Sequence, residues 1–229
     1  MKNLICKLPD NIQCVAARIS LSIVPSKHYP YRTYNHKHKA IFIHVPKVAG
    51  TSVLSLLMQG KIKRDHLTFR EYKQCSTLLY DKYFKFCFVR NPFDRFVSTY
   101  EYLKAGGNGT TDIYFSNIIN NRYKTFEDFV LKGVNSDFIH ESVLFRPQYL
   151  FIYNEKHELQ VDFCGRFESL DEDMVIVNEK LGIECSLGKK NKTKNRKAFG
   201  EYYSDADVIK KITTLYAKDF ELFNYDIKV

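Results

Sequence analysis

The sequence predicts one α/β domain built on a central, mainly parallel sheet with helices on both faces. Two continuous apolar runs, residues 40–45 (AIFIHV) and 83–89 (YFKFCFV), are typical of strands that are buried on both sides. Each run leads through a short turn into a segment with helical apolar spacing. Strands that alternate with helices in this way favour a parallel sheet.

The two strand–turn–helix units are the best defined elements. The turn after the first strand (PKVAGTS) leads into a helix with the sequence SVLSLLMQ, over residues 52–59. After the second strand, Pro92 suits the first position of a helix, because its missing N–H would have no helical partner there. The apolar face of that helix consists of Phe93, Phe96, Val97 and Tyr100.

Later helices are predicted from capping-box spacing, and later strands from short apolar runs. The runs at 149–153 and 161–167 predict two further strands. The last helix is expected to be long, over residues 204–220. The capping pairs, which mark helix starts, are Thr125 with Asp128, Ser169 with Glu172, and Ser204 with Asp207.

Size and composition fit one soluble domain. The chain has 229 residues and a formal charge of +9, which favours anionic partners without choosing among them. We expect residues 1–38 to form an extension packed on or near a domain at 39–229. Charged residues and a proline interrupt the first 25 residues, so we expect neither export nor stable membrane insertion, and a cytoplasmic protein. No cysteines have CxxC spacing, so no zinc or thioredoxin-type site is predicted.

The first functional motif, residues 44–52 (HVPKVAGTS), follows the first strand. Ligands of open α/β sheets bind beyond the carboxyl ends of the strands, and the N–H groups at a helix start favour an anion. Gly50 allows close approach of the main chain, and Lys47 adds a positive charge. The motif therefore predicts a phosphate cradle. It is not a Walker A loop, because the lysine precedes the glycine. The alternative is a plain turn with a surface lysine.

The second motif, residues 88–100 (FVRNPFDRFVSTY), follows the second strand. Arg90 leaves the strand end, and Ser98 lies about two helical turns further on, away from the apolar face. A guanidinium and a hydroxyl on the same side are suited to a second phosphate. The alternative is an ordinary ion pair between Arg90 and Asp94 or Glu101.

Together, the two motifs resemble those of the sulfotransferases that use 3′-phosphoadenosine 5′-phosphosulfate (PAPS). The likeness is to the carbohydrate branch typified by heparan sulfate 2-O-sulfotransferase, and it runs from about residue 39 to the C-terminus. It implies a P-loop-NTPase-like three-layer sandwich and transfer of a sulfuryl group from PAPS to an acceptor hydroxyl, expected on a carbohydrate.

The resemblance also implies residue roles. Lys47 would stabilise charge on the leaving group, and a mobile basic loop at 189–197 would close over the nucleotide. The implied PAPS-binding residues are Lys47, Ala49, Gly50, Thr51, Ser52, Arg90, Ser98, Lys192 and Lys194.

A general base must accept the proton of the acceptor hydroxyl. His66 falls after the first helix, where the enzymes resembled here place a catalytic histidine, and an imidazole suits this task near neutral pH. Glu71 and His140 are the alternatives. Gln148 is a candidate for positioning the substrate. His44 ends a buried strand and is expected to be structural. No metal is expected.

Two other function classes remain to be separated from a sulfotransferase. A P-loop kinase or nucleotide-binding protein would share the architecture, and the net charge suits a nucleic-acid-binding domain. We expect no nucleic-acid partner, because no nucleic-acid-binding motif is found. Segments 102–124 and 134–148 are expected to be variable loops around the acceptor. The sequence identifies neither the acceptor nor the oligomeric state.

Overall fold

The computed structural model describes residues 29–58, 62, 64–183 and 197–229. The chain divides into two compact units. The first takes the chain up to residue 45 together with 50–88 and 151–188, and the second takes 46–49, 89–150 and 189–229. The chain thus passes from the first unit into the second and back within the short turn at 46–49.

The first unit is a mixed α/β structure around a small sheet. Strands β1 (Ala40–Ile43), β2 (Phe84–Val89) and β3 (Phe163–Arg166) lie in the order β1-β2-β3. β1 and β2 run parallel, as predicted. All of β1 is buried, which is why its sequence is apolar without alternation.

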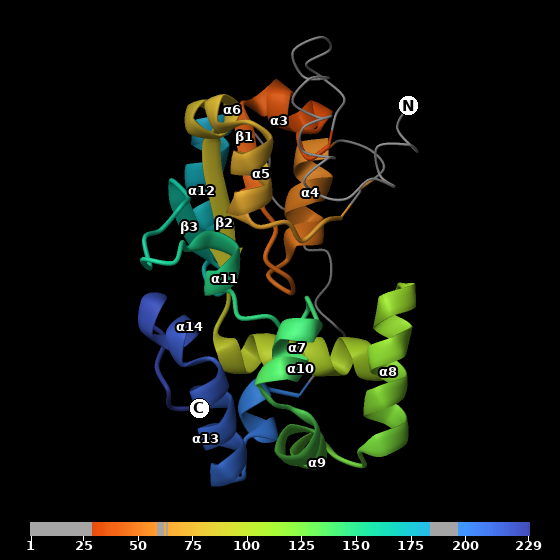
Figure 1. Ribbon diagram of the computed structural model, residues 1–229. Helices are drawn as coiled ribbons and strands as arrows, with labels where there is room; N and C mark the ends of the chain where they lie inside the picture. Colours follow the sequence, from red (N-terminus) through yellow and green to blue (C-terminus); the bar gives the residue numbers. More distant parts are fainter. Residues whose placement is uncertain (1–28, 59–61, 63, 184–196) are drawn as a thin grey trace. The chain divides into compact units, whose positions relative to one another are not determined.

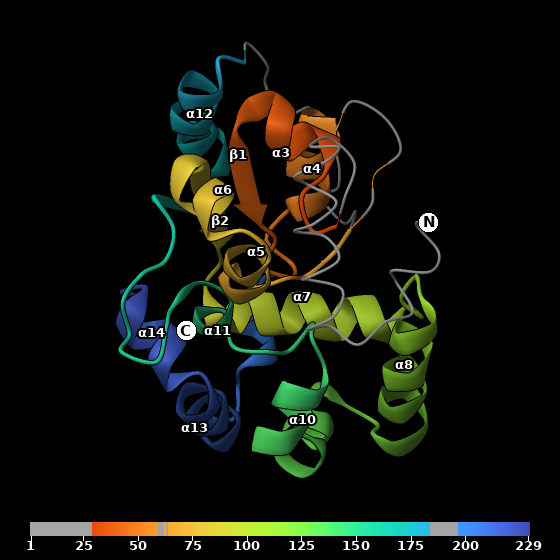
Figure 2. The ribbon, with the colours of Figure 1, turned by 45° about the horizontal axis from the view of Figure 1, so that its top comes forward.

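Helices flank this sheet. Figures 1 and 2 show α4 and α12 on opposite sides of β1 and β2. Helix α3 packs against β1 and α4, and α12 packs against β3. The helices of the first unit are α3 (Thr33–His38), α4 (Gly50–Met58), α5 (Phe69–Cys75), α6 (Thr77–Lys82) and α12 (Leu170–Leu181).

The second unit, as far as it is described, is helical. Its core is one cluster of apolar side chains to which α7 contributes the four residues of the predicted apolar face, all buried. Pro92 is the first residue of α7, as predicted. The elements are α7 (Pro92–Lys104), α8 (Thr110–Arg122), α9 (Phe126–Asp128), the π-helical turn η1 (Phe129–Gly133), α10 (Ser136–Glu141), the 3₁₀ turn η2 (Phe199–Tyr202), α13 (Ala206–Leu215) and α14 (Ala217–Leu222).

The predicted strand at 149–153 is wrong. Residues Tyr149–Ile152 form the short helix α11, and only Tyr153 makes an isolated antiparallel bridge, with Leu159. The carboxylate of Asp219 accepts hydrogen bonds from the N–H groups of Gln148 and Tyr149 at 2.9 Å each. These bonds satisfy main-chain donors that a strand would pair with a neighbouring strand. A contact distant in sequence therefore decides the conformation here.

Two of the predicted capping residues do precede helices. Thr125 caps α9 by accepting from the N–H of Asp128 at 3.1 Å, as predicted. Ser169 precedes α12 but does not cap it, because its hydroxyl donates to the carboxylate of Asp173 at 2.9 Å. The helix was therefore predicted correctly, and its capping bond was not.

The last predicted helix differs in its start and its length. Asp205, not Ser204, caps α13 by accepting from the N–H of Asp207 at 2.7 Å. The helix expected over 204–220 is broken at Tyr216 into α13 and α14. At this break the N–H of Tyr216 still bonds to the carbonyl of Ile212.

Several other expectations concern segments that differ from the prediction or lie partly outside the described residues. The segments expected to be acceptor loops contain helices α8 and α10, so they are not simple loops. Lys192 and Lys194, and all of 189–197 except its last residue, lie outside the described residues, as do residues 1–28 of the expected extension. None of the helices in the described ranges has the length and apolar character needed to span a membrane.

Candidate active site

The turn after β1 has the main-chain geometry of an anion-binding loop. Lys47 has φ 69° and Ala49 has φ 62°, and the residue between them does not have positive φ. Alternating signs of φ turn successive N–H groups toward one concave side, as in the nests that bind phosphate. Side chains disfavour positive φ, and such strain concentrates at functional sites. Lys47 is thus held in a costly conformation that the surrounding structure must stabilise.

Helix α4 begins directly after this turn, at Gly50. A Cβ atom on Gly50 would lie 1.9 Å from Nε2 of His44, so only glycine fits against this imidazole. The structure thus gives Gly50 a packing role that the motif did not reveal. Thr51 and Ser52 follow in the first turn of α4 and are half-buried. The N–H groups of a first helical turn have no partner within the helix.

Arg90 joins the two sequence motifs. Its Nη1 donates to the carbonyl oxygen of Lys47 at 3.0 Å. The ion pair with Asp94, which was the structural alternative, is also formed: Nε and Nη2 each lie 2.8 Å from Oδ2 of Asp94. The side chain of Arg90 is only 8% exposed. The guanidinium therefore fixes the carbonyl of the strained loop, in addition to any ligand it binds.

One face of α7 continues from Asp94. Ser98 and Tyr102 follow at intervals of four residues, which places them on the same helical face. The ammonium of Lys47 lies over the ring of Tyr102, 4.0 Å from its centroid. The hydroxyl of Tyr102 donates to Oδ2 of Asp112 at 2.5 Å, which draws electron density toward the ring. Tyr102 was missed in the sequence, although its spacing from Ser98 was a usable signal.

Gln148 is fully buried beside Arg90. Its Oε1 accepts from the N–H of Arg90 at 3.0 Å, and its Nε2 donates to the carbonyl of Arg90 at 2.8 Å. Both ends of the amide are therefore engaged with the main chain. Gln148 therefore contacts the main chain of Arg90 and not its guanidinium.

His66 is oriented by His44. The Nδ1 of His66 lies 3.0 Å from the carbonyl oxygen of His44, and the two ring centroids are 4.3 Å apart. Because a carbonyl oxygen only accepts, Nδ1 carries the proton, and Nε2 of a neutral ring carries the lone pair. His66 is half-buried. This tautomer is the one that a base acting through Nε2 requires.

His44 is structural, as expected from its place at the end of β1. Its Nδ1 donates to the carbonyl of Asp65 at 3.1 Å, and its ring stacks on Phe42. Burial lowers the pKa of His44 to about 3, with a smaller contribution from the neighbouring His66. The imidazole is therefore neutral at physiological pH.

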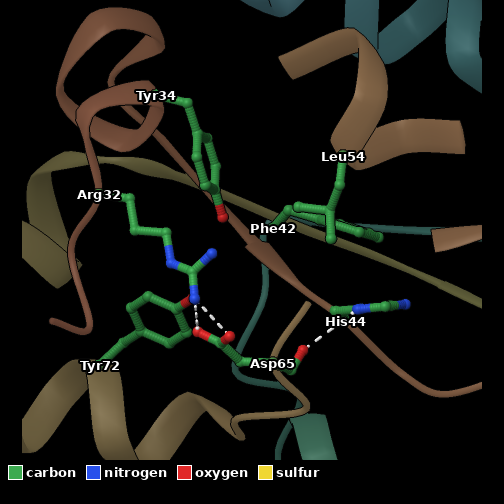
Figure 3. Close-up of a pocket in the computed structure, with 7 residues that line it drawn as sticks. All are labelled: Arg32, Tyr34, Phe42, His44, Leu54, Asp65 and Tyr72. Carbon is green, nitrogen blue, oxygen red and sulfur yellow. Dashed lines mark hydrogen bonds and ion pairs between the residues drawn. The ribbon is translucent and has the colours of Figure 1, made fainter. Parts of the chain in front are cut away.

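The segment that carries His66 is held from the other side by a polar cluster. Figure 3 shows the guanidinium of Arg32 facing the carboxylate of Asp65, with which it forms an ion pair. Tyr34 and Tyr72 are buried in the same cluster, and burial raises the pKa of both phenols. The cavity between them has a volume of about 10 Å³, enough for one water molecule at most. This cluster is therefore support for the segment and not a substrate pocket.

The alternative bases have other surroundings. Glu71 completes a capping box on α5, where its Oε2 accepts from the N–H of Thr68 at 2.9 Å. His140 lies exposed on α10 in the second unit, with Nδ1 2.8 Å from the carbonyl of Ser136. His66, in contrast, is bonded to the main chain of a second histidine, His44, and packs against its ring. Within the described ranges, no three His, Cys, Asp or Glu side chains are grouped so that they could hold a metal ion.

Comparisons with known proteins agree with the sequence motifs. The model of the sulfotransferase family matches residues 31–226. Carbohydrate sulfotransferase 12 of Xenopus laevis is 23% identical, over 90% of this chain and 62% of that protein. Carbohydrate sulfotransferase 11 of Mus musculus is 25% identical, over 83% of this chain and 65% of that protein.

A further relative, an uncharacterized protein of Archaeoglobus fulgidus, is 32% identical over 48% of this chain and 76% of its own length. The chain spans less than two thirds of the length of the two carbohydrate sulfotransferases. No solved structure matches the chain.

Proposed function

The chain belongs to the sulfotransferase family, and we propose that it transfers a sulfuryl group from PAPS to a hydroxyl group of a carbohydrate. The observation that carries this proposal is the bond from Nη1 of Arg90 to the carbonyl of Lys47, 3.0 Å long. It unites two cationic motifs, one suited to each phosphate of the donor, which the sequence separates by 43 residues. The carbohydrate acceptor is proposed from the names of the two carbohydrate sulfotransferases.

The donor would be held by groups that suit its charges. The N–H groups of the turn at 46–49 and of the first turn of α4, with the hydroxyls of Thr51 and Ser52, suit the 5′-phosphate. Arg90 and Ser98 suit the 3′-phosphate. Lys47 would stabilise the negative charge that develops on the departing phosphate, because a positioned cation acts most strongly where charge appears.

The proposed reaction is an in-line transfer. The acceptor oxygen forms a bond to sulfur while the bond from sulfur to the bridging oxygen of the 5′-phosphate breaks, which releases 3′-phosphoadenosine 5′-phosphate (PAP). The proton of the acceptor hydroxyl goes to Nε2 of His66, whose Nδ1 is held by the carbonyl of His44. The proposed reaction uses no metal, since cations and main-chain dipoles of the protein would stabilise the developing charge.

Other parts of the sequence-based prediction remain predictions. They are the P-loop-NTPase-like arrangement, the domain at 39–229, the closure of the basic loop with Lys192 and Lys194, and the cytoplasmic location. The structure of the first unit contains a small sheet flanked by helices. This architecture does not test any of these four predictions.

Calorimetric titration with PAP tests the proposal, with ATP as the competing nucleotide. We expect wild-type protein to bind PAP with micromolar affinity, to prefer it over ATP, and to lose this binding in Arg90→Ala. Arg122→Ala is the matched control, because it removes one exposed positive charge at the end of α8.

The outcomes separate the function classes. Equal or tighter binding of ATP that depends on magnesium would favour a kinase. Salt-dependent binding of DNA or RNA without binding of PAP would favour a nucleic-acid-binding domain. Transfer of radiolabelled sulfate from PAPS to a glycan, abolished in His66→Asn, would extend the result from donor binding to the reaction.

A further inference from the structure

The main chain of Arg90 is held by a side chain at the point where strand pairing ends. Arg90 follows the last residue of β2, and the amide of Gln148 bonds both its N–H, at 3.0 Å, and its carbonyl, at 2.8 Å. The orientation of the amide is unambiguous, because a main-chain N–H only donates and a carbonyl only accepts. Gln148 thus pairs with Arg90 as a neighbouring strand would.

Gln148 is itself fixed by Asp219 of α14. The Oδ2 of Asp219 accepts from the N–H of Gln148, and its Oδ1 accepts from the N–H of Tyr149, both at 2.9 Å. Gln148 and Asp219 are both 0% exposed. Water cannot replace a bond lost at such a depth, so each interaction is costly to break.

The guanidinium of Arg90 depends on this arrangement. A planar guanidinium bonds well only in a narrow range of positions. Here it must satisfy the carboxylate of Asp94, at 2.8 Å, and the carbonyl of Lys47, at 3.0 Å, at the same time. A small displacement of the Arg90 main chain would break one of these contacts. The continuous path of hydrogen bonds is Asp219 to Gln148, Gln148 to Arg90, and Arg90 to the loop of Lys47.

We propose that Gln148 and Asp219 are positioning residues for donor recognition. They fix the main chain of Arg90, and through it both the guanidinium that binds the 3′-phosphate and the carbonyl of the strained loop. Neither residue touches the donor. This inference rests on the proposed function, and it gives the C-terminal helix α14 a direct part in building the donor site.

The test compares the affinities of PAP and of adenosine 5′-phosphate, which lacks the 3′-phosphate. Gln148→Met keeps the length of the side chain and removes both bonds to Arg90. We expect the preference for PAP to fall by roughly tenfold, because one mispositioned charged hydrogen-bond donor has an effect of this size. A loss of overall stability alone would lower the affinities for both ligands by the same factor and leave the ratio of the two affinities unchanged.

Two further variants keep the test decisive. Gln148→Glu retains the acceptor for the N–H of Arg90 and should lose less of the preference than Gln148→Met. Asp219→Asn serves as the second variant if Gln148→Met does not fold. Asp219→Asn should lower the preference, because an amide nitrogen would face one of two N–H groups. Asp173→Asn is the matched control: Asp173 also accepts from a main-chain N–H, that of Arg166, but in the first unit.

The results distinguish this inference from the proposed function. Wild-type protein without a preference for PAP would remove the proposed function, and the inference with it. A wild-type preference that persists unchanged in folded Gln148 and Asp219 variants would overturn the inference alone. A preference lost equally in Asp173→Asn would show that the loss does not depend on the hydrogen bonds to Arg90, and would also overturn the inference.

Discussion

Acidification should destabilise the protein through His44. Its pKa lies near 3 in the folded protein, because burial disfavours the imidazolium, against 6.5 for an ordinary histidine. Between these values the unfolded chain binds a proton that the folded chain does not. The free energy of unfolding therefore falls as pH falls below 6.5. The slope approaches about 1.4 kcal/mol per pH unit, which gives a loss of about 2 kcal/mol between about pH 7 and pH 5.

Urea unfolding of wild-type protein and His44→Asn over this pH range measures the effect. Asparagine keeps a donor for the carbonyl of Asp65 and cannot titrate. The variant should be less stable than wild type near pH 7, because it loses the ring packed on Phe42, and this packing contribution does not itself depend on pH. The difference in stability should shrink by about 2 kcal/mol from about pH 7 to pH 5, because only the wild type loses the contribution of His44.

Subtraction cancels the acid response of the other groups that both proteins share. The parallel variant His66→Asn shows whether the slope belongs to His44 or to its neighbour. Parallel stability curves for wild type and His44→Asn would refute the reasoning, because they would mean that His44 accepts a proton in the folded state without cost.

Two other effects follow from contacts in the same region. Gly50→Ala should lower the free energy of unfolding by about 2 kcal/mol, since the added methyl group overlaps Nε2 of His44, and the double variant with His44→Asn should recover part of this loss. A double-mutant cycle of Lys47→Met and Tyr102→Leu should give a coupling of about 0.5–1 kcal/mol in urea unfolding, which is the size of a cation–π contact, and additive losses would contradict it.

Local patterns predicted the elements that support the candidate site. The apolar run at 40–45 and the run at 83–89 became β1 and β2, and the apolar spacing from Phe93 to Tyr100 became the buried face of α7. These predictions succeed because burial on both faces of a strand, or on one face of a helix, determines the spacing of apolar residues that are close in the sequence.

The failures have a common physical origin. The run at 149–153 has the composition of a strand, but the carboxylate of Asp219, 70 residues further on, bonds to the N–H of Tyr149 at the start of α11. The break at Tyr216 follows from packing as well, since its hydroxyl donates to the carbonyl of Phe145 at 2.6 Å and fixes its ring in the core. Neither contact leaves a signal in the local sequence.

In the candidate site, too, local patterns predicted individual residues but not the contacts between residues distant in sequence. Lys47 and Arg90 were predicted from their places after strands, and His66 from the resemblance. The bond from Arg90 to the carbonyl of Lys47 and the contact of the Lys47 ammonium with the Tyr102 ring arise from the fold and leave no local pattern in the sequence. Gln148 was a sequence candidate for positioning the substrate, and in the structure its side-chain amide bonds to the main chain of Arg90.

The strain of the loop after β1 gives Arg90 a second task. Lys47 and Ala49 both adopt positive φ, at a cost of about 1 kcal/mol or more each. A charged hydrogen bond such as that from Arg90 to the carbonyl of Lys47 contributes about 1.5–3 kcal/mol, which offsets a substantial part of this cost. The residue proposed for the 3′-phosphate thus also maintains the loop proposed for the 5′-phosphate.

This double task predicts a difference between Arg90 and Ser98, the other residue proposed for the 3′-phosphate. Arg90→Ala should weaken the binding of adenosine 5′-phosphate as well as that of PAP, because the loop after β1 loses its hydrogen bond to the arginine. Ser98→Ala should weaken the binding of PAP alone, since Ser98 lies on α7 about two helical turns beyond Arg90, and the bond to the carbonyl of Lys47 comes from Arg90. Arg90→Lys restores the charge but not the planar fork, so it should recover part of the PAP affinity and little of the adenosine 5′-phosphate affinity. Unchanged binding of adenosine 5′-phosphate in Arg90→Ala would show that the loop keeps its shape without the arginine.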